Sequence, residues 1–340
     1  MNGATFYFEW EVNLMHWIQS VMGDIAIALA SFITLFGEET VMVLILAFLY
    51  FCYDKDMGKF IGESISLALV VNPMIKNIFV RRRPYFDNEI IKCLKKVNSD
   101  ADMYDIASQG FSFPSAHSTD SAVVYGSFPI YLSKGLDEAE DVVDSAAAEI
   151  GMNRKKKMTV KRRILVYRIT LVVAFLLPFL VGVSRFSLGV HYPTDVLVGW
   201  ILGVVVLFVT NFLQKKFKRK HLMHLIIFLI CALGIIYCRS DDYYAGLGVM
   251  AGVYLAEFFE EKYVNFENAK NLWRSFLRLI FGGGIYFGLN MLIKLPFSKE
   301  FRDSDTMGAF LFRFIRYTIL CFVLLGVYPM FFKKFNKEKV

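Results

Sequence analysis

The sequence predicts an all-α protein, a polytopic transmembrane helical bundle of about ten spans. The chain is 56% hydrophobic and 16% aromatic with positive mean hydropathy, which leaves too little polar surface for a soluble protein of this length. Apolar runs that approach the roughly 20 residues needed to cross a bilayer recur along its whole length. Lys and Arg gather in the connections between these runs, which is typical of cytoplasmic loops and does not favour a nucleic-acid interface.

The expected elements follow in order. Residues 6–21 mix Trp, Tyr and Phe with Glu, His and Gln, so residues 1–23 are predicted to form a helix in the membrane interface. The candidate spans after it are 24–36, 40–53, 59–80, 115–133, 164–183, 193–213, 221–238, 243–259, 273–293 and 308–332. The first two are short and meet at Gly37, so they are either one bent pair or two tilted spans.

Basic residues also predict the topology. The connections richest in Lys and Arg are expected on the cytoplasmic side: 54–58, 134–163, 214–220, 260–272 and the C-terminus. Residues 134–163 are the one long polar insert and are predicted to be a cytoplasmic loop. The connections expected on the other side of the membrane are 81–114, 184–192, 239–242 and 294–307.

The five cysteines are scattered and form no CxxC pair, so neither a disulfide framework nor a zinc site is predicted. The first apolar run follows an aromatic, acidic start, and no cleavable signal peptide is expected.

Three polar patches fall together on the predicted non-cytoplasmic side, and the first is Lys76 to Arg83-Pro84. Seven residues are about two helical turns, so Lys76 and Arg83 project from one face. Two fixed cations on one face suit a phosphate group. Taken alone, the same residues could be snorkelling anchors at the end of a span.

The second patch is Pro114-Ser115-Ala116-His117, where the fourth apolar run begins. Pro followed by Ser is a helix-start signal, and the free backbone N–H groups of a helix start favour an anion. His117 would lie beside that anion, although a lone histidine at a span end can also be an interfacial residue.

The third patch holds Ser184-Arg185, His191 and Asp195. Pro193 opens the next span, which places Asp195 in its first turn and His191 just before it. A carboxylate at this separation can hydrogen-bond one imidazole nitrogen and leave the other as a nucleophile. A purely structural His–Asp pair would share this spacing.

In order, the three patches read K-x6-R-P, P-S-x-H and S-R-x5-H-x3-D. This pattern resembles the type 2 phosphatidic acid phosphatase superfamily of membrane lipid phosphate phosphatases. The resemblance covers a six-helix core at 24–214, and residues 221–340 form an added C-terminal transmembrane extension of about four helices, as in some larger lipid phosphatases. One departure is Ala116, where the commonest family pattern has Gly.

The resemblance implies a metal-independent hydrolysis of a lipid phosphate or pyrophosphate through a phosphohistidine, with no cofactor. The implied phosphate-binding residues are Lys76, Arg83, Arg185, Ser115 and the Ala116 backbone. His191 is the implied nucleophile, Asp195 orients it, and His117 is the acid and base. The substrate would be a membrane lipid such as a polyprenyl pyrophosphate, phosphatidate, phosphatidylglycerophosphate or sphingosine 1-phosphate.

The expected location is a bacterial plasma membrane with the site facing outward, or an endoplasmic reticulum membrane with a lumenal site. Oligomeric state is not predicted. The alternatives are a lipid phosphotransferase with the same nucleophile, a metal hydrolase using His117, Asp120, His191 and Asp195, and an anion or lipid transporter.

Overall fold

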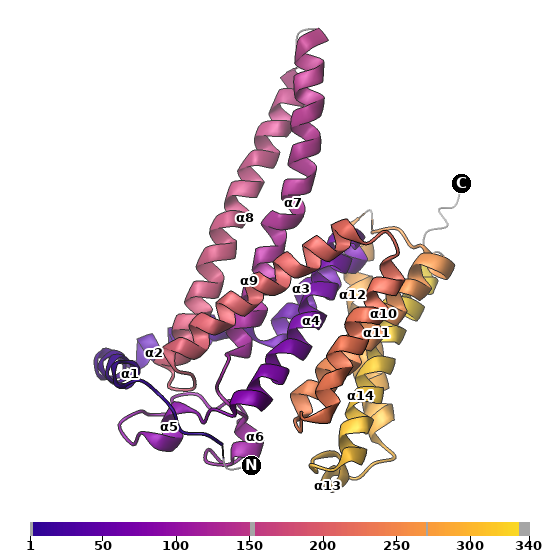
Figure 1. Ribbon diagram of the computed structural model, residues 1–340. Helices are drawn as coiled ribbons and strands as arrows, with labels where there is room; N and C mark the ends of the chain where they lie inside the picture. Colours follow the sequence, from indigo (N-terminus) through magenta and orange to yellow (C-terminus); the bar gives the residue numbers. More distant parts are fainter. Residues whose placement is uncertain (1–2, 150–153, 270, 333–340) are drawn as a thin grey trace.

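The computed structural model describes residues 3–149, 154–269 and 271–332, and every regular element in that part of the chain is helical (Figure 1). The longer helices are α1 (Glu9–Val21), α2 (Asp24–Ile33), α3 (Glu39–Phe48), α4 (Lys55–Phe79), α7 (Ala116–Glu149), α8 (Arg154–Ser187), α9 (Pro193–Lys216), α10 (Lys220–Ala232), α11 (Asp241–Phe259), α12 (Leu272–Lys294) and α14 (Met307–Cys321). The one-turn helices are α5 (Pro84–Asp87), α6 (Ile106–Gln109) and α13 (Lys299–Arg302). Single turns of other helix types extend several of these: η1 (Thr34–Gly37), η2 (Leu49–Tyr53), η3 (Leu233–Ile236), η4 (Glu260–Val264), η5 (Phe322–Val327) and η6 (Tyr328–Phe331).

The outer helices present large apolar side chains to their surroundings. Phe175 on α8, Ile201 on α9 and Phe287 on α12 are 74%, 54% and 71% exposed. Exposed apolar surface on this scale needs lipid rather than water around it. Within the described residues, four helices are long and apolar enough to cross a membrane: Arg162–Ser187, Pro193–Lys216, Leu272–Lys294 and Met307–Phe331. The chain is therefore an integral membrane protein.

The predicted count of about ten spans is not reached by this measure. A fifth span is added only if the bent pair Glu9–Val21 and Asp24–Gly37 is counted as one. Helices α4 and α11 fall outside the count because they lie inside the bundle and carry polar residues. On α4 these include the buried Glu63, Asn72 and Lys76.

The main apolar core lies where α4 packs against α7, α9 and α11. It includes Ile61, Ala68, Val123, Leu247 and Met250, all of which are almost fully buried. Helix α4 is the shared element, because it contacts α7 and α9 on one side and α11 of the C-terminal region on the other. Helix α4 thus positions side chains at both ends of the bundle.

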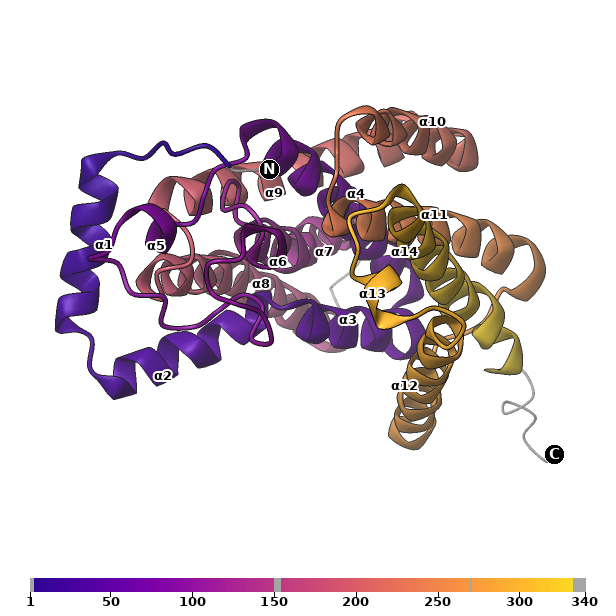
Figure 2. The ribbon, with the colours of Figure 1, turned by 90° about the horizontal axis from the view of Figure 1, so that it is seen from below.

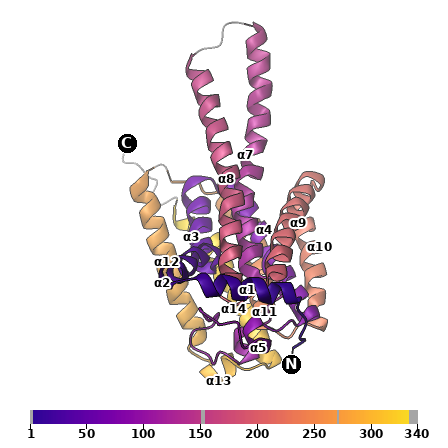
Figure 3. The ribbon, with the colours of Figure 1, turned by 90° about the vertical axis from the view of Figure 1, so that its left-hand side faces the viewer.

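Residues 134–149 and 154–163 continue α7 and α8 as helix, so their prediction as a loop was wrong. The two helices run side by side well beyond the others (Figures 1 and 3). These stretches are polar but rich in Ala, Glu, Lys and Arg, which favour helix, whereas a hydropathy pattern registers only their polarity. Residues 150–153 lie outside the described residues.

The N-terminal helices border one side of the bundle. Helix α1 meets the following Asp24–Gly37 helix at a bend of 120°, and from below the two form an L around α5 and α8 (Figure 2). Figure 3 shows α1 lying across the direction of α7 and α8. This arrangement suits the interfacial position predicted for residues 1–23, which stays a prediction.

Candidate active site

Three segments that are distant in sequence meet at one end of the bundle: the C-terminal end of α4, the start of α7 and the loop from α8 to α9. Backbone hydrogen bonds join them, from Ser112 N to Arg81 O at 2.8 Å and from Ser115 N to Asp195 O at 3.0 Å. Helix α4 ends at Val80, whose left-handed conformation (φ 44°) turns the chain out of the helix. The three predicted patches are therefore neighbours in space.

Two glycines on α9 let it approach α7 closely. A Cβ at Gly199 would lie 2.7 Å from Ser115 O, and one at Gly203 would lie 2.7 Å from both Thr119 O and the Ala122 Cβ. Glycines four residues apart are a common means of close helix packing in membranes. The contact fixes the start of α9, and hence Asp195, against the start of α7.

The second close approach is made by Gly189, in the loop just before His191. Its φ is +80°, and a Cβ there would lie 2.1 Å from Lys92 O. Only glycine suits this position, both for its backbone conformation and for the space. It lets residues 92–94 lie against the α8–α9 loop, where Leu94 N donates to Leu188 O at 3.0 Å.

His191 is 2% exposed and its ring is held in one orientation. Its Nδ1 lies 2.8 Å from Ser112 O, and because a carbonyl only accepts hydrogen bonds, Nδ1 carries the proton. The other nitrogen, Nε2, is then unprotonated, and its lone pair accepts from Arg83 Nη1 at 3.3 Å. This is the tautomer that a nucleophilic imidazole needs.

Burial lowers the pKa of His191 well below its usual value, and the positive charges of Arg83, Arg185 and Lys76 lower it further. The ring is therefore neutral at physiological pH. The three predicted cations and His117 are therefore all close enough to His191 to lower the pKa of its ring.

The cations are themselves buried, and two are fixed by neighbours. Arg83 donates to the carbonyl oxygens of Gln109 and Val190, each at 2.8 Å. Arg185 donates to Thr34 Oγ1 at 2.9 Å, while its buried Nε has no partner among the described residues. Burial also lowers the pKa of Arg83, a sign of the cost of holding this charge away from water. Clustered buried cations with spare donors form an environment for an anion.

The start of α7 completes the site. Ala116 is the first residue of the helix, so its backbone N–H has no partner within α7. The Ser115 side chain is fully buried, and its hydroxyl accepts from Ser118 Oγ at 3.0 Å. Gly37 makes room for His117, because a Cβ there would lie 3.1 Å from the His117 Cβ.

Asp195 does not make the hydrogen bond to His191 that the sequence predicted. Its Oδ2 is 3.6 Å from His191 Nδ1, too long for a hydrogen bond, and accepts instead from Tyr192 N at 2.7 Å. Its Oδ1 accepts from Arg81 Nη1 at 2.7 Å. The Ser112 carbonyl thus orients the ring directly, and Asp195 provides a nearby negative charge.

The residues that orient Asp195 through hydrogen bonds were not predicted from the sequence. Arg81 is 1% exposed and joins Asp195 to Glu11 of α1, whose Oε2 accepts from Arg81 Nη2 at 2.8 Å. Glu11 is fully buried, and its Oε1 accepts from both Thr194 N and Thr194 Oγ1. Arg81 is the first of three successive arginines, and Glu11 lies in a helix predicted to lie in the membrane interface, so neither residue was singled out. The available signal was the run itself, since three successive residues cannot all point to lipid headgroups.

Among the described residues, the two histidines of this site do not belong to a group of potential metal ligands. Within the described residues, the carboxylates and imidazoles of His117, Asp120, His191 and Asp195 do not converge as a ligand set, and one group elsewhere does. The metal-hydrolase alternative therefore has no geometric support in this part of the chain.

Fold and site together define a helical integral membrane protein with buried cations around a buried, neutral histidine. Residues 59–219 match the family model of the PAP2 superfamily, and residues 244–339 match that of the "PAP2 superfamily phosphatase, transmembrane extension". The chain belongs to the PAP2 superfamily and carries its transmembrane extension, which confirms the predicted resemblance.

Two known proteins resemble parts of this chain. The chain is 36% identical over 109 residues to phosphatidylglycerophosphatase B of Bacillus subtilis (strain 168), a match that covers 32% of this chain and 42% of that protein. A crystal structure of a transmembrane PAP2-type phosphatidylglycerolphosphate phosphatase from Bacillus subtilis aligns over 63% of this chain and 90% of its own, at 23% identity and a TM-score of 0.39.

Proposed function

We propose that the protein hydrolyses a membrane lipid phosphate or pyrophosphate through a phosphohistidine on His191, without a metal ion in the reaction. The observation that carries this proposal is the His191 ring. Its Nδ1 proton is held by Ser112 O, and its unprotonated Nε2 lies 3.3 Å from Arg83 Nη1, with two further cations near the ring.

In the first step, His191 Nε2 attacks phosphorus and the bond from phosphorus to the lipid oxygen breaks. His117 donates a proton to the departing oxygen. Lys76, Arg83 and Arg185 bind the phosphoryl oxygens and balance their charge, with hydrogen bonds from Ser115 and the Ala116 N–H. The imidazolium that forms keeps its Nδ1 proton and is stabilised by Asp195, 3.6 Å away.

In the second step, His117 takes a proton from water and the resulting hydroxide attacks phosphorus. The phosphorus–nitrogen bond breaks, phosphate leaves, and His191 returns to its neutral form. The same three cations bind the phosphoryl oxygens when hydroxide attacks as when His191 attacks, so no metal is required to neutralise the charge of these oxygens.

The relative named phosphatidylglycerophosphatase B makes phosphatidylglycerophosphate the first substrate to test, and a bacterial plasma membrane the expected location. We infer that the site is on the non-cytoplasmic face, because the basic connections within 134–149, 154–163 and 214–220 lie at the other end of the bundle (Figure 1).

The test uses purified protein in lipid nanodiscs with excess chelator. We expect free phosphate to be released from phosphatidylglycerophosphate, and a rapidly quenched reaction to contain acid-labile, alkali-stable phosphate on the chain. Transfer of the phosphate to a second lipid, instead of its release as free phosphate, would identify a phosphotransferase. The proposal would be rejected if phosphatidylglycerophosphate, phosphatidate, sphingosine 1-phosphate and a polyprenyl pyrophosphate were all left unhydrolysed.

A further inference from the structure

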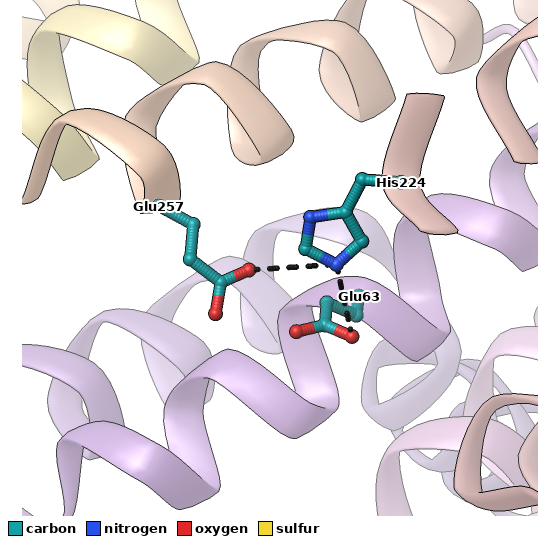
Figure 4. Close-up of side chains that lie close together, drawn as sticks. All are labelled: Glu63, His224 and Glu257. Atoms are coloured by element: carbon teal, nitrogen blue, oxygen red, sulfur yellow. Dashed lines mark ion pairs between the residues drawn. The ribbon is translucent and has the colours of Figure 1, made fainter. Parts of the chain in front are cut away.

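A second group of buried ionisable side chains lies away from the active site. Glu63 of α4, His224 of α10 and Glu257 of α11 point toward one another and are 2%, 3% and 4% exposed (Figure 4). Glu63 precedes Lys76 by 13 residues on the same helix, which is about 20 Å along its axis. The group therefore joins the phosphatase core to the helices that follow it, and plays no direct part at the phosphate.

Three potential ligand atoms converge in this group. One atom from each of Glu63, His224 and Glu257 lies within 4.8 Å of the others. His224 Nε2 is 3.4 Å from Glu63 Oε2 and 3.8 Å from Glu257 Oε2. Figure 4 shows the imidazole directed between the two carboxylates.

Neither nitrogen of the histidine is held by a well-formed hydrogen bond to the described part of the chain. Among the described residues, neither His224 nitrogen has a hydrogen bond of good geometry, and neither does Glu257 Oε2. The ring is nevertheless fixed, since it stacks on Tyr254 with centroids 4.1 Å apart and planes 4° from parallel. A buried imidazole held rigidly without a hydrogen bond is costly, and a ligand on Nε2 would remove that cost.

Charge in the group is unbalanced. Lys220 pairs with Glu63 at 3.0 Å and also contacts Glu257, so one ammonium serves two carboxylates. The neighbouring Lys59 is used by other acids, Glu260 and Glu261, each at 2.9 Å. A divalent cation would neutralise both carboxylates, which one ammonium cannot do.

The surroundings provide a place for Lys220 to move. A cavity of about 330 Å³ lies beside the group and is lined by Lys59, Gln214, Lys220 and Glu261, among others. The Lys220 side chain is 33% exposed and already lies 3.8 Å from Glu261. Gln214 donates to Glu63 Oε2 at 2.7 Å, the kind of outer contact that orients a ligating carboxylate.

We propose that Glu63, His224 and Glu257 bind one divalent transition-metal ion of the Zn²⁺ type, with Lys220 as a built-in competitor that moves into the cavity when the ion binds. Two carboxylates and one imidazole are a common donor set for such ions and leave room for water as a further ligand. The ion would fasten α10 and α11 to α4, so its role is to hold the extension on the core. This site goes beyond the phosphatase function and does not depend on it.

The experiment measures Zn²⁺ bound to the full-length protein after chelator treatment and dialysis. We expect the wild type to hold one Zn²⁺ per chain more than His224→Gln, at equal protein and zinc concentrations. The matched control is His221→Gln, which removes the other histidine of the same helix, 44% exposed and 3.5 Å from Glu261. It should keep the full zinc content, and a loss equal to that of His224→Gln would overturn the proposal.

Lys220→Met separates a metal site from a purely structural ion cluster. Removing the competing ammonium should tighten Zn²⁺ binding by about tenfold or more, whereas a structural cluster would only lose stability. Unchanged or weaker binding in this variant would contradict the proposal. Should His224→Gln fail to fold, Co²⁺ added to the wild type provides the second measurement. Visible d–d bands that one equivalent of Zn²⁺ removes would support the site, and their absence would reject it.

Discussion

The two ends of α4 hold buried charge of opposite sign. At one end Lys76 lies with Arg83 and Arg185 near the neutral His191, and the net effect of the surrounding charges on this ring is positive, because they lower its pKa. At the other end Glu63 lies with Glu257 beside His224, and two carboxylates share one ammonium. Buried charge that protein neighbours do not balance is costly, so each surplus indicates the sign of the ligand.

The histidines of the two ends differ in the same way. His191 has a carbonyl on Nδ1 that fixes its tautomer, whereas His224 has no such partner in the described chain. An oriented ring with one free nitrogen is suited to attack an electrophile, and a ring facing two carboxylates is suited to share a cation with them. We therefore expect the same substitution to affect turnover when it is made at His191, and to affect it little when it is made at His224.

The largest effect is expected from replacing each histidine with glutamine. His191→Gln should lower kcat by at least about a thousandfold, because the nucleophile is lost. His224→Gln should leave kcat within roughly threefold, because Glu63, which His224 faces, lies about 20 Å from Lys76 along α4. Phosphate release from phosphatidylglycerophosphate in nanodiscs measures both. Similar losses in the two variants would remove the functional difference between the two ends.

A smaller effect is expected from the network that holds Asp195. Glu11→Gln removes a negative charge from Arg81 and weakens the bonds to Thr194, so we expect kcat to fall by about 10- to 100-fold with little change in KM. Glu9→Gln is the matched control, since Glu9 is an exposed acid on the same helix. A rise in KM with kcat unchanged would instead assign Glu11 to substrate binding.

Much of the site could be predicted from sequence because its residues are linked by short, regular spacings. The four residues from His191 to Asp195 place this pair at the start of a helix, as predicted. The predicted helical spacing from Lys76 to Arg83 was wrong, because α4 ends at Phe79 and Arg83 follows the turn at Val80. The all-helical fold and the membrane location were predicted from apolar runs, and both are confirmed. The phosphatase relationship followed from the three motifs and is confirmed as well.

Contacts between distant segments could not be predicted in this way. Glu11 and Arg81 are 70 residues apart, and Glu63 and His224 are farther still, so no local pattern connects them. The hydropathy pattern predicted α4 as the span 59–80, but not that its polar side chains are buried against other helices. It also predicted a loop where the described stretches within 134–163 are helical. A polarity pattern distinguishes neither water from a protein neighbour nor a polar helix from a loop.

The smallest effect concerns pH and is best seen on the His191 ring itself. Folding lowers its pKa, so between the folded value and the usual value near 6.5 the unfolded chain binds more protons than the native one. Stability contributed by the neutral ring is therefore complete above about pH 6.5 and is lost as the pH falls through that range. Imidazole ¹⁵N shifts, assigned by comparison with His191→Gln, should show Nδ1 protonated and Nε2 bare at pH 6.5. Lipid phosphates ionise near the same pH, so the free protein is measured rather than turnover. A ring that titrates at or above pH 6.5 would mean that the surrounding cations are balanced, and the positive surplus at this end of α4 would not exist.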